Sequence, residues 1–163
     1  MLPRLNHRGD ETSTDLQVEK IVRRPRPEVA AYSMDYRNEP EWIGAISESR
    51  LVSDGDFGVG SRVSRTASFL GKRIEYVNEV VEYEPGRRLL MRSVQAPFPM
   101  TVSYEFEDTG DGTRVRIRAQ GDAAGFYRFG GPLLTAAVKR AIAGDLRRLK
   151  QQLESRPGSL PGD

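Results

Sequence analysis

The chain has 163 residues, of which 25 are lysine or arginine, 23 are aspartate or glutamate and none is cysteine. This length suits one domain. A sequence without cysteine excludes disulfides, zinc-thiolate sites, iron-sulfur clusters and thiol nucleophiles. Because the charges nearly balance and the arginines are scattered, we expect no nucleic-acid partner.

The opening residues 1–14 are polar and without pattern, and we expect them to form a disordered tail. They contain no apolar run of signal-peptide length. No later stretch approaches the roughly 20 apolar residues of a membrane span. We therefore expect a soluble, cytoplasmic protein that does not insert stably into a membrane.

The first predicted strand follows the tail, in the segment LQVEKIVR. Its residues Leu16, Val18 and Val22 recur at even spacing, the period that places side chains on one face of a strand. Prolines then end the strand. Two short helices are predicted next, at residues 27–34 and 39–43.

The stretch from residue 45 to residue 121 alternates β-branched and aromatic residues with charged ones, which predicts six more strands. They are expected at residues 45–53, 60–69, 72–83, 87–95, 99–108 and 113–121. The separators between them are short, so successive strands should pair antiparallel in a meander. Solvent-side charge pairs are expected between the last two strands, from Thr101, Ser103 and Glu105 to Arg114, Arg116 and Arg118.

The period then changes to about 3.6, which predicts a long amphipathic helix at residues 132–154. Its apolar stripe consists of Leu134, Val138, Ile142, Leu146, Leu149 and Leu153. The opposite face contains Lys139, Arg140, Asp145, Arg147, Arg148 and Lys150. This basic face could attract an anionic membrane, but acids and glutamines interrupt it and a solvated face is the preferred interpretation. Residues 156–163 should form a flexible tail.

These elements predict a single α+β domain at residues 15–155. Its seven-stranded antiparallel sheet should curve around the long C-terminal helix, with the two short helices closing the opening. Small residues on the inner face, among them Ala67, Ser93 and Ala119, leave room for a cavity.

Four segments resemble a known family: RPRPEVAAYSMDYRNEPEWI, NEVVEYEPGRRL, GDGTRVRI and GPLLTAAVKRAIAGDLRRLKQQLE. They are similar to the START-like or Bet v 1-like helix-grip superfamily (SRPBCC), in particular its polyketide cyclase/dehydrase branch, over about residues 15–155. Because these are packing and turn motifs, the resemblance implies the fold more strongly than any reaction.

The sequence excludes several catalytic and metal sites. Its one histidine, His7, lies in the predicted tail, so the body of the domain contains no histidine base, triad or metal ligand. Acidic residues in the predicted turns are attributed to turn chemistry; they are Asp54, Asp56, Glu84, Asp108 and Asp111. We expect neither a metal nor a cofactor.

Polar residues on faces that otherwise point inward are the candidate site residues. Tyr76 and Asn78 alternate with apolar neighbours, and a buried amide needs a partner. A ligand could supply it, as could Tyr104, Arg65 or trapped water, or the face assignment could be shifted by one residue. An inward Arg65 could hold a carboxylate or enolate, but an outward orientation is the preferred interpretation.

Aromatic residues near the open end could be pocket walls or plain core, and core is the more common outcome. They are Trp42, Phe126, Tyr127 and Phe129. Two methionines offer adaptable apolar contacts on the inner face. The predicted ligand-binding set is therefore Trp42, Tyr76, Asn78, Met91, Met100, Tyr104 and Phe126.

The leading hypothesis is a protein that binds a small hydrophobic molecule of lipid, polyketide or quinone type in an internal cavity. An enzyme is the first alternative: the resemblance allows a polyketide cyclase or dehydratase in which Tyr76 is the acid and Arg65 the oxyanion partner. A protein-interaction or chaperone module is the second. The chain could be a monomer or a homodimer.

Overall fold

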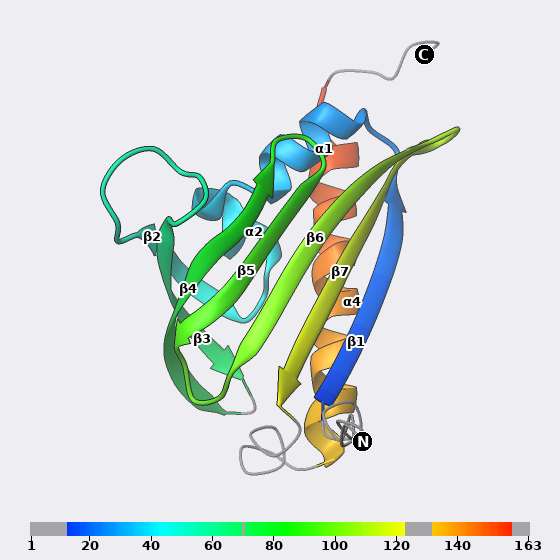
Figure 1. The fold of residues 1–163 in the computed structure, drawn as a ribbon. Coiled ribbons are helices and arrows are strands. Elements are labelled where there is room, and N and C mark those ends of the chain that lie inside the picture. Colours follow the sequence, from blue (N-terminus) through cyan, green and yellow to red (C-terminus); the bar gives the residue numbers. More distant parts are fainter. Residues whose placement is uncertain (1–12, 70, 123–131, 158–163) are drawn as a thin grey trace, which may run out of the picture.

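The computed structural model describes residues 13–69, 71–122 and 132–157, and the structural statements below refer to them (Figure 1). Its elements are β1 (Ser13–Val22), α1 (Arg26–Ser33), the 3-10 turn η1 (Tyr36–Asn38), α2 (Glu39–Trp42), β2 (Ile46–Leu51), β3 (Arg62–Phe69), β4 (Lys72–Glu84), β5 (Arg88–Gln95), β6 (Met100–Thr109), β7 (Gly112–Asp122) and α4 (Pro132–Glu154). The predicted fold class is confirmed. The long helix has the predicted bounds, and β1 begins at Ser13, inside the segment expected to be a tail.

The seven strands form one antiparallel sheet in the order β1-β7-β6-β5-β4-β3-β2. The strands β2 to β7 form a meander, as predicted, with short turns from β3 onward and a loop of ten residues, 52–61, between β2 and β3. Strand β1 adds to the free edge of β7. The turn between β6 and β7 requires glycine. Gly112 has φ +144°, and a Cβ there would lie 2.3 Å from the carbonyl oxygen of Val22. The hairpin can therefore close against the end of β1.

The sheet curls around α4, and α1 and α2 lie at one end of the resulting groove (Figure 1). The main core lies at that end. Leu146, Leu149 and Leu153 of α4 are fully buried there, together with Val29 and Ala30 of α1. Each buried leucine stabilises the fold by roughly 1.5–3 kcal/mol. The cavity lies beside the N-terminal half of α4, where Leu134, Val138 and Ile142 line it.

The helices of the described ranges differ in length. Both α1 and α2 are short, and the long α4 contains charged residues as well as leucines. In these ranges, no helix is both long and apolar enough to cross a membrane.

Candidate ligand-binding cavity

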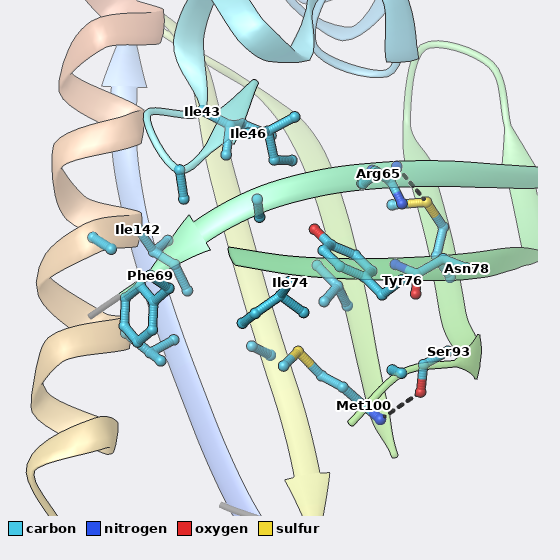
Figure 2. Close-up of a pocket in the computed structure, with 18 of the residues that line it drawn as sticks. Ile43, Ile46, Arg65, Phe69, Ile74, Tyr76, Asn78, Ser93, Met100 and Ile142 are labelled. Carbon is cyan, nitrogen blue, oxygen red and sulfur yellow. Dashed lines mark hydrogen bonds between the residues drawn. The ribbon is translucent and has the colours of Figure 1, made fainter. Parts of the chain in front are cut away.

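A cavity of about 230 Å³ lies between the concave face of the sheet and the N-terminal half of α4 (Figure 2). Its wall is mostly apolar and includes Ile43, Ile46, Phe69, Ile74, Phe98, Met100, Val102, Ile117, Leu134, Val138 and Ile142. The small residues expected to leave room, Ala67, Ser93 and Ala119, all line it. A concave apolar space with a few polar groups is the usual form of a small-molecule site.

The pairing of β3 with β4 places the polar groups on this wall. Arg65 lies opposite Tyr76, and Val63 lies opposite Asn78, which in turn faces Ser93 of β5. Since alternate residues of a strand point to the same face, Arg65, Tyr76 and Asn78 all belong to the concave side. Figure 2 shows the Tyr76 side chain extending from its strand into the space between the sheet and α4, with Asn78 beside it and Arg65 on the neighbouring strand.

The inward orientation of Arg65 corrects the outward orientation preferred from the sequence. Its partner explains it: Arg65 Nε lies 2.5 Å from Glu39 Oε2, and Nη2 lies 2.6 Å from Oε1. Both side chains are 3% exposed. Ser49 Oγ donates a further bond of 3.1 Å to Glu39 Oε2, and Arg65 Nη2 lies 3.4 Å from Met91 Sδ. A bidentate pair of this kind neutralises the guanidinium inside the protein.

Several polar groups of the wall have no hydrogen-bond partner among the described residues. Arg65 Nη1 and Trp42 Nε1 are buried and unpaired. No bond is formed by the Asn78 amide or by the hydroxyls of Tyr76 and Tyr104, so neither Tyr104 nor Arg65 is the partner of Asn78. A buried donor left unpaired costs about 1–3 kcal/mol. These groups belong to side chains that line the cavity.

Burial keeps the two tyrosines of the wall in their neutral form. Desolvation raises the pKa of Tyr76, opposed by the charge of Arg65 and reinforced by Glu39 and Asp145. Desolvation also raises the pKa of Tyr104, where Glu39 adds to the effect and Arg65 opposes it. Both phenols can thus donate hydrogen bonds at neutral pH.

Asp145 is a carboxyl group that lines the cavity, and it was missed from the sequence, which placed it on the solvent face of the helix. Its side chain is 12% exposed and lines the cavity. Asp145 Oδ1 accepts a 3.0 Å bond from the backbone N–H of Gly44 and lies 3.8 Å from Arg148 Nη2. Desolvation raises the pKa of Asp145 against these two contacts. The sequence feature that could have identified Asp145 is its position between Ile142 and Leu146, which places it beside the apolar stripe of the helix.

Glu39 was also missed, because an acid in the first turn of a short helix is normally explained by the helix dipole. Of the predicted ligand-binding set, Trp42, Tyr76, Asn78, Met91, Met100 and Tyr104 line the cavity. Phe126, like Tyr127 and Phe129, falls outside the described residues, as does His7. Within the described ranges, no three histidine or acidic side chains are grouped to hold a metal ion.

Comparison with known proteins gives a family and a fold. The sequence profile of the family described as polyketide cyclase/dehydrase and lipid transport matches residues 13–154. No curated protein sequence matches at a significant level.

Solved structures match the whole domain at low sequence identity. The Zhui aromatase/cyclase from Streptomyces sp. R1128 has a TM-score of 0.75 at 15% identity, over 93% of this chain and 99% of that chain. TTHA0849 from Thermus thermophilus has a TM-score of 0.74 at 16% identity, over 89% and 100%. Ara h 8.0201 has a TM-score of 0.67 at 15% identity, over 88% and 99%. At such identities the likeness shows the fold alone.

Proposed function

Because the chain belongs to the polyketide cyclase/dehydrase and lipid transport family, we propose that it binds a small, largely apolar molecule of lipid, polyketide or quinone type in the cavity. The family implies a hydrophobic ligand in a cavity. The observation that carries the proposal is the hollow of about 230 Å³ whose apolar wall contains unpaired buried donors.

The direct test is to extract the purified protein with organic solvent and to identify co-purifying molecules by mass spectrometry. A second measurement uses the neutral fluorescent probe N-phenyl-1-naphthylamine, whose emission rises in an apolar site. Ala67→Phe fills the cavity and should weaken probe binding by at least about tenfold, since about 1.4 kcal/mol corresponds to a factor of ten.

The matched control is Ser68→Phe, which adds an aromatic ring to the next residue of β3 on the exposed face. It should leave probe binding unchanged. If neither an extracted ligand nor saturable probe binding is found, or if both variants behave alike, the proposal is wrong. A stable protein partner in a pull-down without any bound small molecule would instead support an interaction module.

An enzyme is supported by one specific observation. Tyr76 lies directly opposite Arg65, with its hydroxyl unpaired among the described residues, so a phenol and a guanidinium face the same space. In an aldol ring closure, the enol carbon bonds to a carbonyl carbon, the carbonyl oxygen takes the proton of Tyr76, and the enol hydroxyl returns its proton to the Tyr76 phenolate as it becomes a ketone. Tyr76→Phe should then abolish turnover of a poly-β-ketone analogue while ligand affinity stays nearly unchanged. Unchanged turnover would exclude this role.

A further inference from the structure

The charged groups at the cavity set what kind of molecule can enter it. Among the described lining residues, the charged side chains are Arg65 and Asp145. Arg65 is already paired with Glu39 through two hydrogen bonds of 2.5 and 2.6 Å. With that pair neutral overall, Asp145 is the remaining charge of the wall, and its cationic neighbour Arg148, 3.8 Å away, is about half exposed to water.

We propose that Glu39 and Asp145 make the cavity selective for uncharged molecules that carry a hydrogen-bond acceptor, such as a carbonyl oxygen, and exclude carboxylates. Glu39 is then a specificity-determining residue, because it occupies the arginine that would otherwise bind an acid. This inference rests on the proposed ligand-binding function and refines its substrate class.

The unpaired donors indicate the acceptor. Trp42 Nε1 and Arg65 Nη1 are buried without a partner, and neither group can accept a hydrogen bond. The groups that would satisfy them are therefore oxygen acceptors. A carbonyl oxygen provides one without bringing a second charge into a space where ions are poorly solvated. A hydrocarbon would leave both donors unpaired.

The pKa of Tyr104 indicates how the cavity wall affects a buried negative charge. Its phenolate would be a buried negative charge beside the cavity, and its pKa is raised, mainly by desolvation and next by Glu39. The opposing effect of Arg65 is smaller than that of Glu39 at this hydroxyl, and Asp145 adds to the increase. At Tyr76 the effect of Arg65 exceeds that of Glu39, yet desolvation still raises the pKa. Burial disfavours the negative charge at both hydroxyls, and a carboxylate placed at the same wall would lose its hydration in the same way.

The test compares two ligands that differ mainly in charge. Methyl decanoate and decanoic acid are each used to displace N-phenyl-1-naphthylamine from the full chain at pH 8, where the acid is ionised. The ester should displace the probe at a concentration at least about tenfold lower than the acid. An ester also binds any apolar site better than a carboxylate does. The decisive quantity is therefore how the acid-to-ester ratio of displacing concentrations changes in variants.

Glu39→Gln removes the negative charge that neutralises Arg65 and should reduce the acid-to-ester ratio of displacing concentrations at least threefold. Glu41→Gln is the matched control, because Glu41 lies on the same helix, is exposed and bonds to Tyr32 instead. Its ratio should equal that of the parent chain. Asp145→Asn provides an independent variant if Glu39→Gln does not fold, and should lower the ratio in the same direction.

The outcomes separate the two proposals. If neither the probe nor the ester binds, the ligand-binding function fails. If both bind but decanoate displaces the probe as well as the ester does, the function stands and the charge selectivity is overturned. A ratio that stays the same in both Glu39→Gln and Asp145→Asn also overturns it, because the selectivity would then come from apolarity alone.

Discussion

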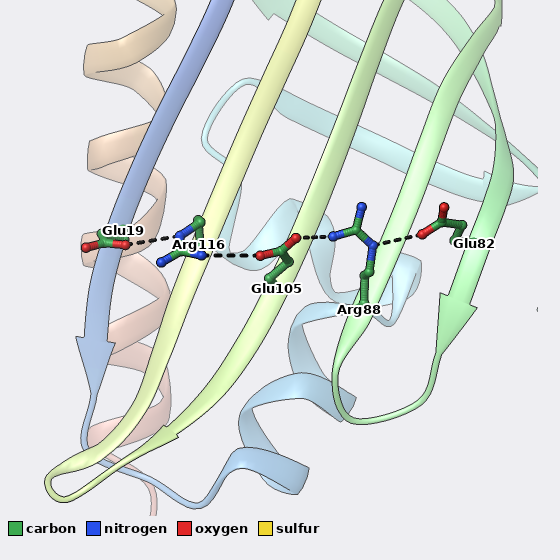
Figure 3. Close-up of polar contacts among 5 residues, drawn as sticks. All are labelled: Glu19, Glu82, Arg88, Glu105 and Arg116. Atoms are coloured by element: carbon green, nitrogen blue, oxygen red, sulfur yellow. Dashed lines mark hydrogen bonds and ion pairs between the residues drawn. The ribbon is translucent and has the colours of Figure 1, made fainter.

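The two faces of the curled sheet use the same pair of chemical groups in opposite environments. On the convex face, arginines and glutamates alternate across five neighbouring strands, namely Glu19, Arg116, Glu105, Arg88 and Glu82 (Figure 3). All are about one third to one half exposed. On the concave side, Arg65 and Glu39 form one ion pair, and each is 3% exposed. The two sets contain the same chemical groups and differ in their exposure to water.

This difference in solvation changes what each set contributes. An exposed ion pair typically adds about 0–1 kcal/mol, since water already solvates both charges. A buried pair gains little over an apolar pair of the same size, yet removing one partner costs about 3–5 kcal/mol. A contribution to stability therefore does not explain why an ion pair is present on the concave side. Control of the charge that a ligand meets explains it better.

The largest expected effect comes from breaking the concave pair. Arg65→Met leaves the Glu39 carboxylate buried without its partner and should lower the free energy of unfolding by about 3–5 kcal/mol. Urea denaturation at neutral pH measures it. The matched change on the convex face, Arg116→Met, should lower it by at most about 1 kcal/mol.

The double variant Arg65→Met with Glu39→Met sharpens the comparison, because it removes both charges together. It should recover most of the stability lost in Arg65→Met. If Arg65→Met and Arg116→Met lowered the free energy of unfolding by the same small amount, the difference between the two faces would be contradicted.

A smaller effect is expected in the titration of two aspartates. Desolvation raises the pKa of Asp145 above 3.8, whereas the hydrogen bond from Arg118 lowers the pKa of Asp15 on the convex face below it. Asp145 therefore opposes folding while it is ionised, and stability is gained as pH falls through its folded-state pKa toward 3.8. Asp15 acts with the opposite sign, since its contribution is lost as pH falls through its lowered pKa.

Carbon-13 NMR of the side-chain carboxyl groups can follow both titrations in one sample. Asp145 should titrate at the higher pH. Asp145→Asn keeps an acceptor for the Gly44 N–H and should remove only the part of the pH dependence that belongs to this group. If Asp145 titrated below Asp15, the cavity wall would not be the poorly solvating environment that the selectivity requires.

The sequence was sufficient for features that depend on local periodicity. Apolar residues three or four positions apart predicted the bounds of α4, and alternation placed Tyr76 and Asn78 on the inner face. Polar and charged pairs between β6 and β7 were also predicted. Within the predicted set, Ser103 lies opposite Arg118 and Glu105 lies opposite Arg116, whereas Thr101 faces Gln120 and Arg114 faces Glu107.

The sequence was insufficient where a side chain depends on a distant partner. Alternation put Arg65 on the same face as Val63 and Ala67. A charge is tolerated there because Glu39, which belongs to α2, pairs with it through two hydrogen bonds. No local pattern links residues 26 positions apart. The same holds for Asp145, whose contact with Gly44 spans 101 positions.

The smallest effect is expected on the convex face, at Glu105. This carboxylate contacts both Arg88 and Arg116, so Glu105→Gln removes more pairing than a change at either end of the row. The free energy of unfolding should still fall by less than about 1 kcal/mol. At 1 M salt, where the screening length is about 3 Å, the difference from the parent chain should disappear. Urea denaturation at low and high salt measures both values. A salt-independent loss as large as that of Arg65→Met would mean that the row is as poorly solvated as the concave pair, and would remove the contrast from which the selectivity of the cavity is argued.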